Sequence, residues 1–201
     1  MVKIKPGQHW DYANYTFRTG TRPFTGIEMI LSTMIENFTK VTSHPCGAFS
    51  ATNDRIARNA ISDTAIVMSY SLLEGFFHEE YEYYVQDGKS KKPGELSALI
   101  NTLLHAHKIS LRDWRERRKV LDLVKDLRNA VVHSNGQIDG DIYKEKCIAL
   151  LQEDLFEHSI HYPTLTFSGS LWLLREFQSI ADEYSESVFN NLSNHLNAQA
   201  T

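Results

Sequence analysis

Long apolar runs, cysteine and proline are all scarce in this chain of 201 residues. No run approaches the roughly 20 apolar residues that cross a bilayer, which predicts a protein without a membrane span. The N-terminal stretch has no apolar segment of the signal-peptide type. The two cysteines, Cys46 and Cys147, lie far apart without metal-ligand spacing. Together these features indicate reduced thiols and a cytoplasmic protein.

An excess of charge of one sign and the common catalytic motifs are also missing. The net charge is −4, so any nucleic-acid site must be a local patch. No Gly-rich phosphate loop, Gly-x-Ser-x-Gly elbow or His-Glu-x-x-His occurs. His105 and His107 point to different sides of a helix, and the pair His158 and His161 has no third ligand. The sequence therefore predicts no metal and no cofactor.

Helical periodicity is what the chain does have, with 42% hydrophobic residues. Residues 1–22 are polar and aperiodic, which indicates an irregular N-terminal arm before a single domain over residues 23–201. Helices are predicted at about 25–41, 53–86 with a break near Ser62 and Asp63, 95–106, 110–133, 142–157, and from Ser170 past Leu192. A short extended excursion is expected in the segment 159–169, where Pro163 breaks the helical pattern. The predicted fold is an all-α bundle of about five or six helices.

Helix starts and buried faces can also be predicted. Thr25 with Glu28 forms a capping box, Phe24 with Met29 a hydrophobic staple, and Ser110 with Asp113 a second N-cap pair. Two buried stripes follow from the spacing of apolar residues. The first comprises Ile66, Tyr70, Leu73, Phe77, Tyr81 and Tyr84, and the second comprises Val120, Leu123 or Val124, Leu127 and Val131.

The stretch "LRNAVVHSNG" (Leu127 to Gly136) ends the most strongly patterned helix. Arg128 and His133 are ordinary residues for a last helical turn, where they complement the helix dipole, and Asn-Gly is an ordinary C-cap. The same two residue types also suit phosphodiester chemistry. A guanidinium matches phosphate oxygens, and an imidazole moves protons near neutral pH. Spacing alone leaves both interpretations open.

This motif resembles that of the HEPN (higher eukaryotes and prokaryotes nucleotide-binding) families, in which an arginine and a polar residue precede a histidine. The upstream segment "SYSLLEGFFHEEYEYY" resembles the helix that packs beside the motif. The resemblance covers residues 60–155 and implies a HEPN-like helical bundle. It also implies a metal-independent endoribonuclease and a homodimer, often a toxin or antiviral-defence effector controlled by an antitoxin or other regulatory protein. By position, Arg128 would hold the scissile phosphate, His133 would transfer the proton, and Asn129 would be the polar neighbour.

Other residues are candidates for supporting roles. In related HEPN proteins an acidic residue at the position of Glu74 can pair with the motif arginine, although Glu74 also fits a solvated position beside the core. Seven basic and four acidic residues lie between 112 and 128. Of these, Arg115, Arg118 and Lys125 are candidate RNA contacts, but such a run is more often a solvated face. Lys89, Lys91 and Lys92 form a basic loop with the same interpretation.

Helix geometry adds an expectation about oligomeric state. Five residues along a helix place Arg128 and His133 about 140° apart, so one protomer brings them together with difficulty. A homodimer with this helix near its twofold axis would do so. The functional prediction is therefore a cytoplasmic endoribonuclease that leaves 2′,3′-cyclic phosphate ends. The alternatives are a non-catalytic HEPN-like module that binds a partner protein, a nucleotide or RNA, and a helical adaptor.

Overall fold

The computed structural model describes residues 22–42, 51–85, 93–112, 114–133, 153–158 and 163–199. Five α-helices occupy most of this part of the chain, and a short hairpin precedes the last helix. In chain order the described elements are α2 (Arg22–Thr42), α3 (Ala51–Tyr84), α4 (Leu96–Ala106), α5 (Arg115–His133), the 3-10 helix η1 (Glu153–Leu155), β1 (Phe156–His158), β2 (Pro163–Leu165) and α7 (Phe167–Gln199). The predicted all-α class is confirmed. None of the described helices is long and apolar enough to cross a membrane.

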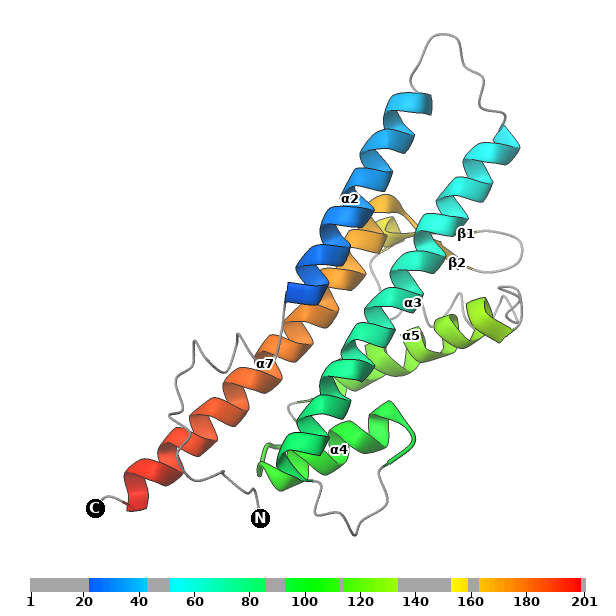
Figure 1. Cartoon of the computed structure of the whole chain (residues 1–201). Helices are drawn as coiled ribbons and strands as arrows, with labels where there is room; N and C mark the ends of the chain where they lie inside the picture. Colours follow the sequence, from blue (N-terminus) through cyan, green and yellow to red (C-terminus); the bar gives the residue numbers. More distant parts are fainter. Residues whose placement is uncertain are drawn as a thin grey trace.

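The long helix α3 is the centre of the bundle and contacts each of the other described α-helices (Figure 1). Helix α7 runs beside it, and α2 packs on both of them toward one end. Helices α4 and α5 pack on α3 toward the other end, where α5 crosses it at an angle and extends away from it. The motif-bearing end of α5 therefore projects from the side of the bundle.

The buried face of α3 follows the predicted stripe. All six of its residues, from Ile66 to Tyr84, are at most 5% exposed. Near the crossing with α5, the rings of Phe77, Trp114 and Tyr184 pack edge to face, with centroids 5.1–6.4 Å apart. Such pairs stabilise a core beyond the area that they bury, so the aromatic cluster anchors α5 to α3 and α7.

The predicted helix starts are wrong in detail. Helix α2 begins at Arg22, so Thr25 lies inside the helix instead of before it. Pro23 does not prevent this start, because proline is tolerated in a first helical turn. Glu28 accepts a hydrogen bond from Arg175 Nε at 2.8 Å, and Met29 is 67% exposed, which rules out the staple. The remaining arm, residues 1–21, lies outside the described residues.

Helix α7 begins at Phe167, one turn before the predicted start. The hydroxyl of Thr166 accepts a hydrogen bond from the Gly169 N–H at 3.0 Å, which is the geometry of an N-cap. Ser170, the predicted cap, is fully buried inside the helix. The cap is therefore Thr166.

The predicted break in α3 does not exist, and a hairpin replaces the end of the helix predicted over 142–157. Ser62 is buried, and its hydroxyl accepts a hydrogen bond from the Leu165 N–H of β2 at 2.9 Å. Strand β1 starts at Phe156 and pairs with β2 in antiparallel register, Phe156 opposite Leu165. The extended excursion is confirmed at β2, and residues 142–152 lie outside the described part.

Helix α5 also begins later than predicted, at Arg115. The Ser110 hydroxyl accepts a hydrogen bond from the Arg112 N–H in the preceding turn, and Asp113 lies outside the described residues. The predicted stripe is confirmed at Leu123, Val124 and Leu127 and is wrong at its two ends. Val120 and Val131 are half-buried, and the buried residues are Leu121, Leu123, Val124, Leu127 and Ala130.

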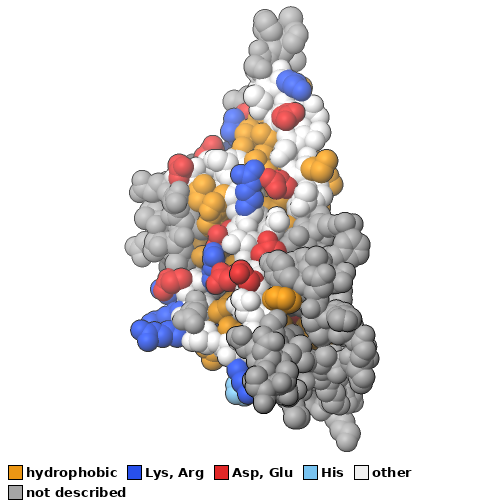
Figure 2. Space-filling model, turned by 90° about the vertical axis from the view of Figure 1, so that its left-hand side faces the viewer, with side chains coloured by type: hydrophobic (Ala, Val, Ile, Leu, Met, Phe, Trp, Pro, Cys, Tyr) orange, Lys and Arg blue, Asp and Glu red, His pale blue; other side chains and the backbone are white. Residues whose placement is uncertain are grey.

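The face formed by α2 and α7 has no single character over its described part. Hydrophobic, basic and acidic side chains are interspersed along it (Figure 2). The exposed apolar side chains on α2 are Met29, Ile30, Met34 and Val41. The described charges on this face are mixed in sign, as the small net charge of the chain suggests.

Candidate active site

Arg128 lies on the flank of α5 that turns toward α3. Its guanidinium carbon is 6.0 Å from the centroid of the Tyr70 ring on α3, and its Nη1 donates a hydrogen bond to Asn129 Oδ1 at 3.1 Å. The side chain is half-buried, and its buried Nε–H has no acceptor among the described residues. No described carboxylate forms an ion pair with it. Most of the five guanidinium donors are therefore not engaged by the described residues.

Tyr70 supplies the surface on which Arg128 packs. The side chain is 5% exposed, and burial raises the pKa of its phenol to about 12, with a further contribution from the nearby Glu74 carboxylate. Arg128 acts in the opposite direction on this pKa but does not overcome burial. Tyr70 therefore stays neutral at any physiological pH and does not neutralise the guanidinium.

Glu74 lies one turn after Tyr70 on α3 and is half-buried. It is near enough to act electrostatically on the Tyr70 phenol, yet the described contacts include no ion pair between Glu74 and Arg128. The pairing that the resemblance implies is thus not formed in this structure. Its supporting role stays a prediction.

His133 is the last residue of α5, and its side chain lies outside the described residues. From the helix geometry, its position is about 140° around the axis from Arg128, whereas Asn129 is only about 40° from His133. The hydrogen bond from Arg128 to Asn129 therefore draws the guanidinium toward the side of α5 that carries His133. Asn129 is thus the residue of the motif to which Arg128 is hydrogen-bonded.

The basic residues of α5 fall into two groups. Arg117 binds the carboxylates of Glu176 and Glu183 on α7, and Lys125 lies 3.5 Å from Glu95. Arg115 is exposed and Arg118 half-buried, and within the described part of the chain neither forms an ion pair. Arg115 and Arg118 are thus the two predicted RNA contacts whose charge is not already compensated. The basic loop of Lys89, Lys91 and Lys92 lies outside the described residues.

The other aromatic and histidine residues considered from the sequence lie in the core or belong to no group of metal ligands among the described residues. Tyr81 and Tyr84 are buried and Tyr83 is half-buried, so these rings pack inside the protein. His107 is 5% exposed, whereas its neighbour in the sequence pattern, His105, is exposed at the end of α4. Among the described residues, no three His, Cys, Asp or Glu side chains converge as metal ligands do.

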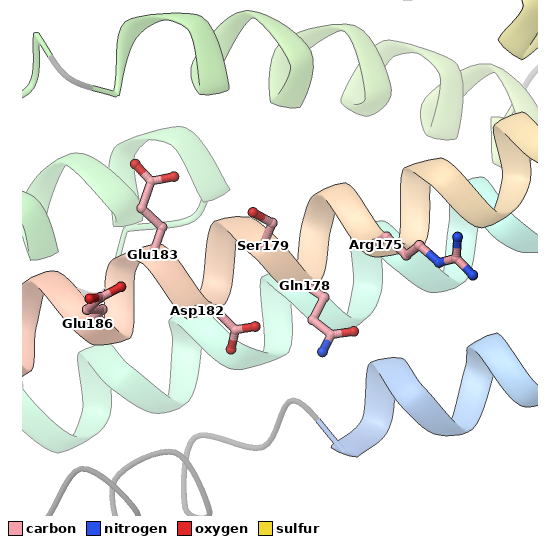
Figure 3. A pocket seen from close by; sticks show the side chains of 6 residues that line it. All are labelled: Arg175, Gln178, Ser179, Asp182, Glu183 and Glu186. Atoms are coloured by element: carbon pink, nitrogen blue, oxygen red, sulfur yellow. The ribbon is translucent and has the colours of Figure 1, made fainter.

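A shallow groove of about 560 Å³ runs along α7, and six of its side chains line it (Figure 3). Three are carboxylates, Asp182, Glu183 and Glu186, and burial raises the pKa of Asp182. Glu183 points toward α5, where Arg117 binds it, and Asp182 points away from α5. The acidic lining repels phosphates, so this groove is not the site that Arg128 and His133 would form.

The contact between Tyr70 and Arg128 was not predicted from the sequence, although Tyr70 was predicted to lie on the buried face and Arg128 in the motif.

Comparison with known proteins assigns neither a family nor a function to the chain. No protein-family model matches the chain. Searches of curated proteins and of solved structures also found no match.

Proposed function

We propose that this protein is a metal-independent endoribonuclease of the HEPN type. The observation that carries the proposal is the state of Arg128, a half-buried guanidinium that packs on a neutral ring and forms no ion pair within the described structure. Its buried Nε–H has no acceptor among the described residues, which is compatible with a site that binds an anion. A phosphate is an anion whose oxygens the guanidinium donors can bind in pairs.

The proposed role of Arg128 is to hold the scissile phosphate and stabilise its developing charge. Because Asn129 and Tyr70 contact the guanidinium before substrate arrives, its orientation does not have to be organised during the reaction. Donors that are preorganised in this way account for much of the rate enhancement in many enzymes. Arg115 and Arg118 would bind flanking phosphates along α5.

The proposed role of His133 is proton transfer. The 2′-hydroxyl oxygen attacks the adjacent phosphorus and its proton passes to solvent water, the bond from phosphorus to the 5′-oxygen breaks, and a 2′,3′-cyclic phosphate remains. His133 as imidazolium donates the proton that the leaving 5′-oxygen requires. Its position in the last turn of α5 favours the charged form through the helix dipole.

A homodimer is part of the proposal. The C-terminal end of α5 projects from the bundle, and Val132, the neighbour of His133, is 47% exposed. An apolar side chain beside the motif suits a contact between two copies of α5 around a twofold axis. Such a contact would place Arg128 of one protomer near His133 of the other.

The test is cleavage of labelled single-stranded and structured RNAs in EDTA by purified protein. The wild type is expected to cut and to leave cyclic phosphate ends, and Arg128→Ala and His133→Ala are expected to lose this activity. Two matched controls, Arg175→Ala on α7 and His105→Ala in the last turn of α4, should cut normally. Loss of activity in the controls as well, or equal cutting by all variants, would refute the assignment of the site.

Mixing the two inactive variants tests whether the site is shared. In a dimer with composite sites, random exchange of Arg128→Ala and His133→Ala protomers restores about a quarter of the wild-type activity. The reason is that half of the dimers are mixed and each mixed dimer has one intact site. No restoration would mean that the motif acts within one protomer or not at all.

By the same resemblance, we propose a cytoplasmic toxin or antiviral-defence effector that is controlled by an antitoxin or other regulatory protein. The alternative, a HEPN-like module that binds RNA, a nucleotide or a protein without cutting, is an outcome of the same assay. RNA binding that is equal in wild type and His133→Ala, with cleavage by neither, would establish this alternative.

A further inference from the structure

The contact between Tyr70 and Arg128 joins two helices at the proposed site. Tyr70 belongs to the buried face of α3, and its ring is fixed by the surrounding core at 5% exposure. The guanidinium carbon of Arg128 lies 6.0 Å from the centroid of that ring. The only hydrogen bond that the structure gives the guanidinium, within the described residues, is the one to Asn129.

An aromatic ring holds an arginine differently from a carboxylate. A carboxylate would accept two of the guanidinium donors and compensate the charge, as Glu176 and Glu183 do for Arg117 three turns earlier on the same side of α5. A ring attracts the cation through its electron-rich face and occupies no N–H donor. The guanidinium is thus oriented but still free to bind a phosphate.

We infer that Tyr70 is a positioning residue, whose ring fixes the Arg128 guanidinium in the orientation needed to bind an RNA phosphate. This inference rests on the proposed function for the identity of the anion. The orientation of Arg128 itself does not depend on that function. The ring, and not the phenolic oxygen, is the element that acts, so Tyr70→Phe preserves the effect and Tyr70→Leu removes it.

The first test follows the Arg128 side chain directly. In a ¹⁵N-labelled protein, the Arg128 Nε–Hε signal is assigned by its loss in Arg128→Lys. Because this group is buried, its proton is expected to exchange slowly with water in the wild type and in Tyr70→Phe. It is expected to exchange rapidly, or to broaden, in Tyr70→Leu. Slow exchange in all three proteins would overturn the inference.

A matched control separates positioning from general loss of stability. Tyr81 lies on the same buried face of α3 at 2% exposure, and no described contact joins it to Arg128. Tyr81→Leu removes a comparable ring from the core and is expected to leave the Nε–Hε signal unchanged. If Tyr81→Leu altered the signal as strongly as Tyr70→Leu, the effect would be a loosened core and the inference would fail.

The second test uses RNA cleavage well below the melting temperature of each variant. Tyr70→Leu is expected to lower kcat about tenfold to a hundredfold with a smaller change in KM, since the charge of Arg128 remains while its alignment is lost. Tyr70→Phe should restore kcat, and an equal loss in Tyr70→Phe would overturn the role of the ring. If the wild type cut no RNA, the proposed function would fail, and the exchange measurement would still decide whether Tyr70 positions Arg128.

Discussion

His107 offers a test of the packing between α4 and α7. Its ring packs edge to face against Tyr84 and Tyr184, with centroids 4.8 and 5.9 Å away, and the residue is 5% exposed. Its buried Nε2 has no hydrogen-bond partner in the described structure. Burial lowers the pKa of His107 from 6.5 to about 4. The folded protein therefore keeps this imidazole neutral where the unfolded chain protonates it.

The sign of the effect follows from proton binding. Between pH 6.5 and 4 the unfolded state binds a proton at His107 that the folded state does not, so the free energy of unfolding falls as the pH falls. The contribution is fully present above pH 6.5 and is lost as the pH approaches 4. The difference between the two pKa values corresponds to about 3 kcal/mol.

The assay compares wild type with His107→Phe, in which a ring of similar shape cannot titrate. Urea unfolding is followed by tryptophan fluorescence, to which the fully buried Trp114 contributes. The variant is expected to gain about 3 kcal/mol relative to wild type between pH 7 and pH 4. A difference that is the same at both pH values would refute the assignment of a buried neutral His107.

Asp63 provides a control of opposite sign. Burial raises the pKa of its carboxyl to about 6, and its buried Oδ1 has no described hydrogen-bond partner. The folded state therefore keeps a proton that the unfolded state loses as the pH rises through 3.8–6, so stability from this group is present at low pH and lost toward pH 6. Relative to wild type, Asp63→Asn is expected to lose stability as the pH falls, which is the reverse of His107→Phe.

Further predictions concern packing and ion pairs, and each is measured by denaturant unfolding. Arg117→Met leaves two carboxylates of α7 without their partner and is expected to cost about 1–2 kcal/mol, whereas Arg175→Met, at a 64% exposed side chain, should cost under about 1 kcal/mol. Equal costs would contradict the difference in burial. A Cβ at Gly169 would overlap the carbonyl oxygen of Leu155, so Gly169→Ala is expected to destabilise by several kcal/mol. Gly75→Ala meets no atom within 4 Å inside α3 and should stabilise by about 1 kcal/mol; a loss there would mean that the helix is strained at this point.

The sequence predicted those features that depend on local periodicity. The six-residue stripe of α3 is buried as expected, because residues three and four apart share one face of a helix wherever that helix packs. The extended segment at β2 was predicted from Pro163, which cannot continue a helix. The class of fold follows from the same regularities.

Features that depend on tertiary contacts were not predictable. Residues 156–158 look like the end of a helix, yet Phe156 pairs with Leu165, whose N–H binds Ser62 on α3. The break predicted at Ser62 is absent for a related reason. The Ser62 hydroxyl accepts a hydrogen bond from the hairpin and does not compete for the backbone of its own helix.

In the candidate site, too, local features were predictable and contacts between helices were not. The motif placed Arg128 beside Asn129 because they are neighbours, and the structure adds their hydrogen bond. The contact with Tyr70 depends on where α5 crosses α3, and periodicity does not determine crossing angles or register between helices. For the same reason the sequence could not say whether Glu74 reaches Arg128.

We propose that Arg128 and His133 cut RNA without a metal. The most direct measurement is single-turnover cleavage of end-labelled RNA in EDTA by wild type, Arg128→Ala and His133→Ala. The wild type is expected to leave cyclic phosphate products, and both variants are expected to lose at least about a hundredfold in rate. Cleavage by Arg128→Ala at the wild-type rate, or cleavage that appears only when a divalent metal is added, would contradict the proposal.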